Sequence, residues 1–211
     1  KLIYTGYVAE AAAAPAGPGS ASENGRGEDI VMVGGGAVGE PLLRTALLAR
    51  PLSRARDRVW RLLTGPNLPD PVHDELRWNA ADGVVVERWR ADIPTLLANA
   101  TLAVSQAGYN TMMDLLGAAV PAVVVPFTTE TETEQAARAQ VLAARGAVTL
   151  VPAQELSPKR LAAAIDETLT KPRRSLPLDR RGAETTARAI AAFCAGAGAG
   201  WEAGAVPGGD A

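Results

Sequence analysis

The sequence predicts an α/β fold in which six parallel strands form a doubly wound sheet. The first observation is that short, β-rich apolar runs alternate with helical patterns from Asp29 to Phe193. The second is that runs such as DIVM (29–32) are apolar without interruption, as in strands buried on both faces of a sheet. The third is an ordinary globular composition, with 47% hydrophobic and 21% charged residues.

Helix start and stop signals separate the expected elements. Asp92 and Ser157 each precede a proline-containing first turn, and Gly146 follows the last residue of a helical pattern. We expect strands within residues 29–35, 57–66, 83–89, 101–108, 121–127 and 147–152. We expect helices within residues 40–50, 70–81, 92–100, 110–119, 131–146, 157–169 and 181–193.

The regions flanking residues 29–193 have a different composition. Residues 1–8 (KLIYTGYV) are predicted to form a strand-like linker, and residues 9–28, rich in Ala, Gly and Pro, a flexible loop. Residues 194–211 are predicted to be a disordered tail. Because the chain starts with Lys1, we expect a fragment or an expressed domain.

Charge and rare residues exclude several functions. The formal net charge of −2 gives no strong field for nucleic acid. One cysteine, Cys194, and one histidine, His73, exclude an internal disulfide and any metal site built on two histidines or a cysteine cluster. We expect His73 to be an exposed helix residue. No apolar run is long enough to span a membrane, and we expect a cytoplasmic protein.

Three loops should meet at one edge of the sheet, because the carboxyl ends of parallel strands lie together. They are Gly34–Gly39, Ser105–Thr111 and Thr128–Gln135. The glycine spacing matches a dinucleotide fingerprint, but the second strand ends in Thr-Gly-Pro without the required acid. No Gly-Lys-Ser/Thr follows, so a P-loop is excluded. A tight turn without any ligand remains an alternative for these glycines.

Asp114 lies three residues after Thr111, so both side chains fall on one helical face near the helix start. A carboxylate there can accept two hydrogen bonds from a ribose diol while the helix amides meet phosphate. An ordinary surface position is the alternative. Thr133 is a candidate cap for the following helix, and Gln135 has donor and acceptor groups for sugar hydroxyls. Acids at a helix start are equally explained by the helix dipole.

The three loops together resemble a known family. The segments VGGGAVGE, ATLAVSQAGYNTMMDLLGAAVPAVVVPF and ETEQAARAQVLAARGAV, in this order, resemble the C-terminal donor-binding domain of GT-B glycosyltransferases of family 28. That family includes the lipid II-forming N-acetylglucosaminyltransferase, and the segments resemble its less characterised predicted bacterial relatives. The resemblance covers about Asp29 to Leu169 and implies a Rossmann-like sheet that forms one half of a GT-B fold.

The resemblance implies a nucleotide diphosphate sugar, usually a UDP-sugar, as the donor. Asp114 would bind the ribose, where the family more often has Glu, and Glu134 would contact the sugar, where the family often has Gln or Asp. Backbone around Arg88, Trp89 and Arg90 would hold the base. The full set of implied donor-binding residues is Gly34, Gly35, Gly36, Trp89, Arg90, Ser105, Ala107, Gly108, Asn110, Thr111, Asp114, Glu134 and Gln135.

The function that the resemblance implies is hexosyl transfer to an acceptor, with inversion favoured and without a metal or other cofactor. The acceptor site and the catalytic base would belong to an N-terminal domain, which is also the implied partner and the implied route to peripheral membrane association. The chain alone is then expected to bind donor without turnover. Two alternatives remain: a nucleotide-sugar hydrolase of similar fold, and a non-catalytic nucleotide-sugar-binding module.

Overall fold

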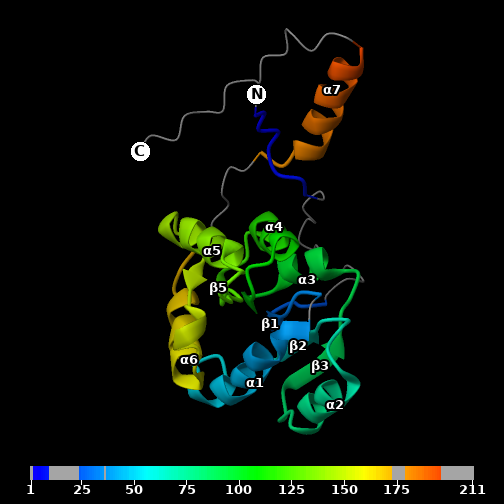
Figure 1. The fold of residues 1–211 in the computed structure, drawn as a ribbon. Coiled ribbons are helices and arrows are strands. Elements are labelled where there is room, and N and C mark those ends of the chain that lie inside the picture. Colours follow the sequence, from blue (N-terminus) through cyan, green and yellow to red (C-terminus); the bar gives the residue numbers. More distant parts are fainter. Residues whose placement is uncertain (1, 10–23, 36, 173–178, 196–211) are drawn as a thin grey trace. The chain divides into compact units, whose positions relative to one another are not determined.

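The computed structural model describes residues 2–9, 24–35, 37–172 and 179–195 (Figure 1). The chain divides into two compact units, one made of Lys1–Ala11 with Pro177–Ala211 and the other of Ala12–Leu176. Most of the expected loop at 9–28 and of the expected tail at 194–211 lies outside the described residues.

The larger unit contains a six-stranded parallel sheet in the order β3-β2-β1-β4-β5-β6, which confirms the predicted fold class. Chain order reverses between the central neighbours β1 and β4, so this sheet has the switch point of a doubly wound fold. The strands are β1 (Asp29–Met32), β2 (Trp60–Thr64), β3 (Val84–Arg88), β4 (Leu102–Ser105), β5 (Ala122–Val124) and β6 (Thr149–Leu150).

Helices cover both faces of this sheet (Figure 1). Helix α1 packs against α2 and α6 on one face, and α3 packs against α4 on the other. The core between the sheet and α1 and α6 contains Val31, Leu43, Val104 and Leu161, all 1% exposed or less. The helices of this unit are α1 (Glu40–Ala49), α2 (Asp70–Trp78), α3 (Ile93–Asn99), α4 (Tyr109–Ala118), α5 (Glu134–Ala144) and α6 (Pro158–Thr168).

Two predicted helix ends are confirmed and two caps were predicted wrongly. Ser157 Oγ accepts from Arg160 N, and Gly146 follows α5 with a φ of 68°. Asp92 precedes α3 but makes no capping hydrogen bond, because its carboxylate pairs with Arg90. Thr133 likewise makes no cap, and a neighbouring carboxylate takes that role, as described below.

His73 is buried, which corrects the expectation of an exposed residue. Its side chain on α2 is 7% exposed and its Nδ1 lies 3.0 Å from Thr64 Oγ1 at the end of β2. Burial, followed by the nearby Arg88, lowers the pKa of His73. The histidine therefore ties a helix to the sheet.

The smaller unit joins the two ends of the chain. Val8 forms an antiparallel bridge with Arg181, Tyr7 N donates to Asp179 O, and Gly182 N donates to Tyr7 O. Helix α7 (Gly182–Cys194) follows, and Thr186 on it donates to Thr5. The sequence pattern placed this last helix with the sheet, whereas its contacts group it with the N-terminal residues. None of the helices in the described part of the chain has the length and apolar content for crossing a membrane.

Asp29 opens β1 as a buried acid. It is 1% exposed; Oδ1 accepts from Arg58 Nη1 at 3.2 Å, while Oδ2 is buried without a hydrogen-bond partner. Burial raises the pKa of Asp29 from 3.8 to about 6, against the opposing effect of Arg58. The folded state thus holds this proton more tightly than the unfolded state does.

We predict that Asp29 contributes more to the stability of the protein in acid than at neutral pH. Its contribution is fully present below pH 3.8 and is lost as pH rises through about 6, a change of about 3 kcal/mol in the free energy of unfolding. Urea unfolding of D29N between pH 4 and pH 7.5 should lack this component, so the variant gains relative to wild type as pH rises. The exposed Asp57→Asn serves as control. An unfolding free-energy difference between D29N and wild type that does not vary with pH would contradict this.

Candidate functional site

The strand register brings three loops to one edge of the sheet, as predicted. Met32 pairs with Ser105, and Ser105 pairs with Val124, so β1, β4 and β5 end at the same level. Val125 N continues this alignment by donating to Ser105 O at 2.8 Å. The loops after these strands therefore start side by side at the switch point.

Three glycines at this edge have no packing reason to be glycine. A Cβ added to Gly34 or Gly35 would meet nothing within 4 Å, and one added to Gly108 would meet only Thr111 Oγ1 at 3.8 Å. None of the three has a positive φ. By contrast, a Cβ on Gly39 would lie 2.3 Å from Val33, so that glycine is explained by the close approach of α1 to β1. Gly36 lies outside the described residues.

Two side-chain amides that the sequence did not single out donate hydrogen bonds to the glycine loop. Asn67 Nδ2, from the loop after β2, donates to Gly35 O at 2.5 Å. Gln106 Nε2, directly after β4, donates to Val38 O at 3.3 Å. Both are polar side chains that follow a strand, which was the available signal. Together they hold the Gly34–Gly39 turn against its neighbours on both sides.

Helix α4 starts at this edge without a side-chain cap. Gly108 is its N-cap, no acid occupies its first turn, and the first amides of a helix have no acceptor within the helix. Asn110 is exposed and Thr111 is half-buried. Ser105 is fully buried and its hydroxyl donates to Gln106 O, so its side chain stabilises the strand end. The helix start therefore offers amides and a positive dipole end.

Asp114 lies one turn further along α4. It is half-buried, as is Thr111 three residues earlier, whereas Met112, Met113 and Leu115 are buried. The predicted sharing of one helical face by Thr111 and Asp114 agrees with this pattern of burial.

Helix α5 is tied to the loop between β4 and α4 by two side chains. Gln135 Oε1 accepts from Ala107 N at 3.1 Å and from Phe127 N at 3.2 Å. Arg138 Nη1 donates to Ala107 O at 2.8 Å. Ala107, itself fully buried, is thus held at both its backbone polar groups. The Oε1 atom of Gln135 is therefore committed to two backbone amides.

The start of α5 is capped by Glu132 rather than Thr133. Glu132 Oε1 accepts from Glu134 N at 3.0 Å and from Gln135 N at 3.3 Å. This carboxylate satisfies two amides at the positive end of the helix dipole.

In the loop after β3, Trp89 is exposed whereas Arg90 is ion-paired. Trp89 is 55% exposed. The Arg90 guanidinium pairs with both carboxylate oxygens of Asp92 at 2.7 Å and with Glu87 at 3.2 Å. Arg90 is therefore engaged within the protein, and Trp89 presents an accessible indole at this position.

Four acids beside helix starts at this edge are paired with arginines. Glu40 in the first turn of α1 pairs with Arg44 at 2.7 Å, and Asp92 before α3 pairs with Arg90. The remaining pairs of this kind are Asp70 with Arg88 at α2 and Glu134 with Arg138 at α5. Helices α3, α4 and α6 have no acid in the first turn, and of these α4 is the one that starts beside the glycine loop after β1. The edge is thus largely neutralised around an α4 start that favours an anion.

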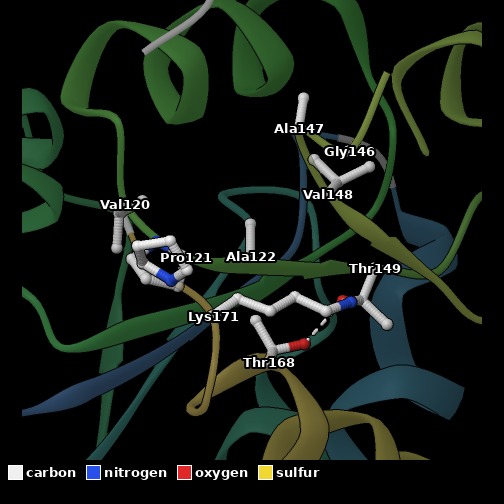
Figure 2. Close-up of a pocket in the computed structure, with 10 residues that line it drawn as sticks. Val120, Pro121, Ala122, Gly146, Ala147, Val148, Thr149, Thr168 and Lys171 are labelled. Carbon is white, nitrogen blue, oxygen red and sulfur yellow. Dashed lines mark hydrogen bonds between the residues drawn. The ribbon is translucent and has the colours of Figure 1, made fainter. Parts of the chain in front are cut away.

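The described residues contain no group of three His, Cys, Asp or Glu side chains that could hold a metal ion. A hollow at the opposite edge of the sheet, beside the first residues of β5 and β6, is shown in Figure 2. Its polar groups are paired: Thr168 donates to Thr149 at 2.7 Å, and Lys171 contacts Thr149 at 2.9 Å and Glu167 at 2.7 Å. We interpret this cluster as part of the packing of α6 on β6.

In a parallel doubly wound sheet, the carboxyl ends of the strands at the switch point are where such α/β domains bind their ligands. The model of the glycosyltransferase family 28 C-terminal domain matches residues 30–192, and the chain belongs to this family.

Curated relatives agree with this assignment. The UDP-N-acetylglucosamine–N-acetylmuramyl-(pentapeptide) pyrophosphoryl-undecaprenol N-acetylglucosamine transferase of Leuconostoc mesenteroides is 29% identical over 140 residues, which cover 66% of this chain and 39% of the relative. The protein of the same name from Brucella anthropi is 36% identical over 83 residues, covering 39% of this chain and 22% of the relative. The chain thus spans well under half the length of these relatives.

Solved structures share the fold at lower identity. The spinosyn rhamnosyltransferase SpnG complexed with thymidine diphosphate has a TM-score of 0.58 at 18% identity, over 86% of this chain and 46% of that chain. MurG of Acinetobacter baumannii has a TM-score of 0.51 at 20% identity, over 67% of this chain and 41% of that chain. The predicted resemblance to GT-B glycosyltransferases is confirmed at the level of family and fold.

We predict that Gln135 stabilises the protein by accepting hydrogen bonds from the backbone amides of Ala107 and Phe127. Replacing it with Leu leaves the amides of Ala107 and Phe127 without their acceptor, which costs about 1–3 kcal/mol for a buried group. Gln135→Glu keeps an acceptor and should lose less. The check is thermal and urea unfolding, with the exposed Gln140→Leu on the same helix as control. Equal stability of Q135L and Q140L would refute the role of Gln135.

Proposed function

We propose that this chain is the donor-binding part of a glycosyltransferase that transfers a hexosyl group from a nucleotide diphosphate sugar. The observation that carries the proposal is the open space beside Gly34, Gly35 and Gly108. Glycine there is explained neither by φ nor by packing, and a pyrophosphate needs such close approach of the backbone. Family membership supports this interpretation.

The site residues take the following roles in this proposal. Amides of Gly34, Gly35 and the α4 start (Gly108–Thr111) bind the diphosphate. Ala107, whose amide donates to Gln135 Oε1, orients this start. Asp114 accepts from the ribose hydroxyls, and Glu134 with the Nε2 group of Gln135 faces the sugar. The segment Arg88–Arg90 lies beside the nucleobase of the donor, on which the exposed Trp89 can stack. Gly36 belongs to the glycine loop by sequence.

The chemical contribution of these residues is to stabilise the leaving group. As the glycosidic bond to the diphosphate breaks, negative charge grows on the phosphate oxygens. Helix amides that already point at those oxygens stabilise the charge without reorganising. The acceptor site and the base that deprotonates the acceptor hydroxyl belong to the remainder of a full-length enzyme, so this chain binds donor without transferring it.

A UDP-sugar is the proposed donor. The curated relatives named above are UDP-N-acetylglucosamine transferases, and SpnG was solved with thymidine diphosphate. Both names concern nucleoside diphosphates with a pyrimidine base. We place the protein in the cytoplasm, where such donors are made, with an N-terminal acceptor domain as its partner.

We predict that UDP binds to the chain and that Asp114→Asn weakens this binding about tenfold to hundredfold, because a carboxylate acceptor on the ribose diol is lost. Calorimetric titration with UDP, UDP-N-acetylglucosamine, dTDP and GDP measures the affinity and ranks the bases. Asp82→Asn, an exposed acid just before β3, is the matched control.

Two results would refute the donor site. The first is no binding of any of the four nucleotides at millimolar concentration. The second is equal affinity for UDP in wild type and D114N. Loss of UDP binding in D114N with retained binding of inorganic pyrophosphate would support the division between ribose and phosphate contacts.

A further inference from the structure

Arg138 connects two parts of the candidate site with one guanidinium group. Its Nη1 donates to Ala107 O, immediately before the α4 N-cap, while its Nη2 pairs with Glu134 in the first turn of α5. The same group lies over the ring of Tyr109, 5.6 Å from the ring centroid. The side chain is 16% exposed, whereas that of Glu134 is 76% exposed. A largely buried cation thus underlies an exposed carboxylate.

The segment around Glu134 is acidic, so an anionic ligand beside it needs a neutralising cation. Between Phe127 and Arg138 the sequence has three glutamates, Glu130, Glu132 and Glu134, and no basic residue. Glu132 is taken up by the α5 amides. Glu134 carries its charge into solvent close to the α4 start, where a diphosphate with several negative charges would be repelled.

Other acids beside helix starts at this edge are also neutralised by arginines. Glu40 and Arg44, at the start of α1, repeat the i,i+4 arrangement of Glu134 and Arg138. Arg138 differs from Arg44 in that its guanidinium also holds the backbone carbonyl that precedes α4. Its position couples the charge of α5 to the orientation of the α4 start.

We propose that Arg138 is a positioning residue for the donor: by neutralising Glu134 and holding Ala107, it makes the α4 start acceptable to a diphosphate beside an acid. This inference rests on the proposed donor site. Arg138 acts through Glu134 and Ala107 and does not itself touch the ligand. Sequence patterns singled out Glu134 and Gln135 but not Arg138, because its contact with Ala107 spans 31 residues of chain.

The test is a double-mutant cycle of wild type, R138A, E134Q and R138A/E134Q, measured by calorimetric titration with UDP. R138A should bind UDP about tenfold more weakly than wild type, because Glu134 is then unpaired beside the phosphates. The double variant R138A/E134Q should recover most of this loss, because the repelling charge is gone. R138K keeps the charge but lacks the two separate donors that reach Ala107 O and Glu134, so its affinity for UDP should fall between those of wild type and R138A. Arg145→Ala, an exposed arginine after the same helix, controls for net charge.

The cycle separates charge from structure. A merely structural role through Ala107 would leave R138A and R138A/E134Q equally weak, and this outcome would overturn the proposal. UDP binding by R138A that equals wild type would also overturn it. The penalty in R138A should shrink from UDP to UMP to uridine, and an equal penalty for uridine would argue against it. If wild type binds none of these nucleotides, the donor-site proposal fails instead.

Discussion

The pairing of β1 with β4 is the interaction on which the candidate site depends. These two strands are central in the sheet, and the chain order reverses between them. Their register, Met32 opposite Ser105, sets the glycine loop beside the start of α4. A shift of two residues in this register would separate the two loops by about 7 Å. Buried strands such as Ile30–Val31 and Leu102–Val104 fix the register through packing on both faces.

A second constraint is electrostatic. Helix starts point at this edge and favour anions, and acids at such positions are favoured for the same reason. The protein therefore holds acids next to the place where a phosphate would bind. Pairing Glu40, Asp92 and Glu134 with arginines removes much of this competition. Helix α4 has no acid in its first turn and no side-chain cap, which suits the proposed diphosphate site.

The sequence was sufficient for the strands, the helices and the edge at which the loops meet, because periodicity, glycines and prolines are local signals. It was misleading where contacts outside the local pattern determine the burial or the hydrogen-bond partner of a side chain. His73 looked like a surface histidine, but Thr64 and the end of β2 bury it. Asp92 looked like a cap, but it pairs with Arg90. Asn67 and Gln106 were missed because their partners are backbone carbonyls elsewhere in the fold.

We propose that the turn after β1 and the start of α4 together receive a pyrophosphate. The most direct measurement is a titration of the isotope-labelled chain with UDP, followed by amide NMR shifts. The account predicts the largest shifts at Gly34, Gly35 and residues 108–111, with smaller ones at Asp114. Shifts concentrated instead around Thr149 and Lys171, at the opposite edge of the sheet, would contradict it.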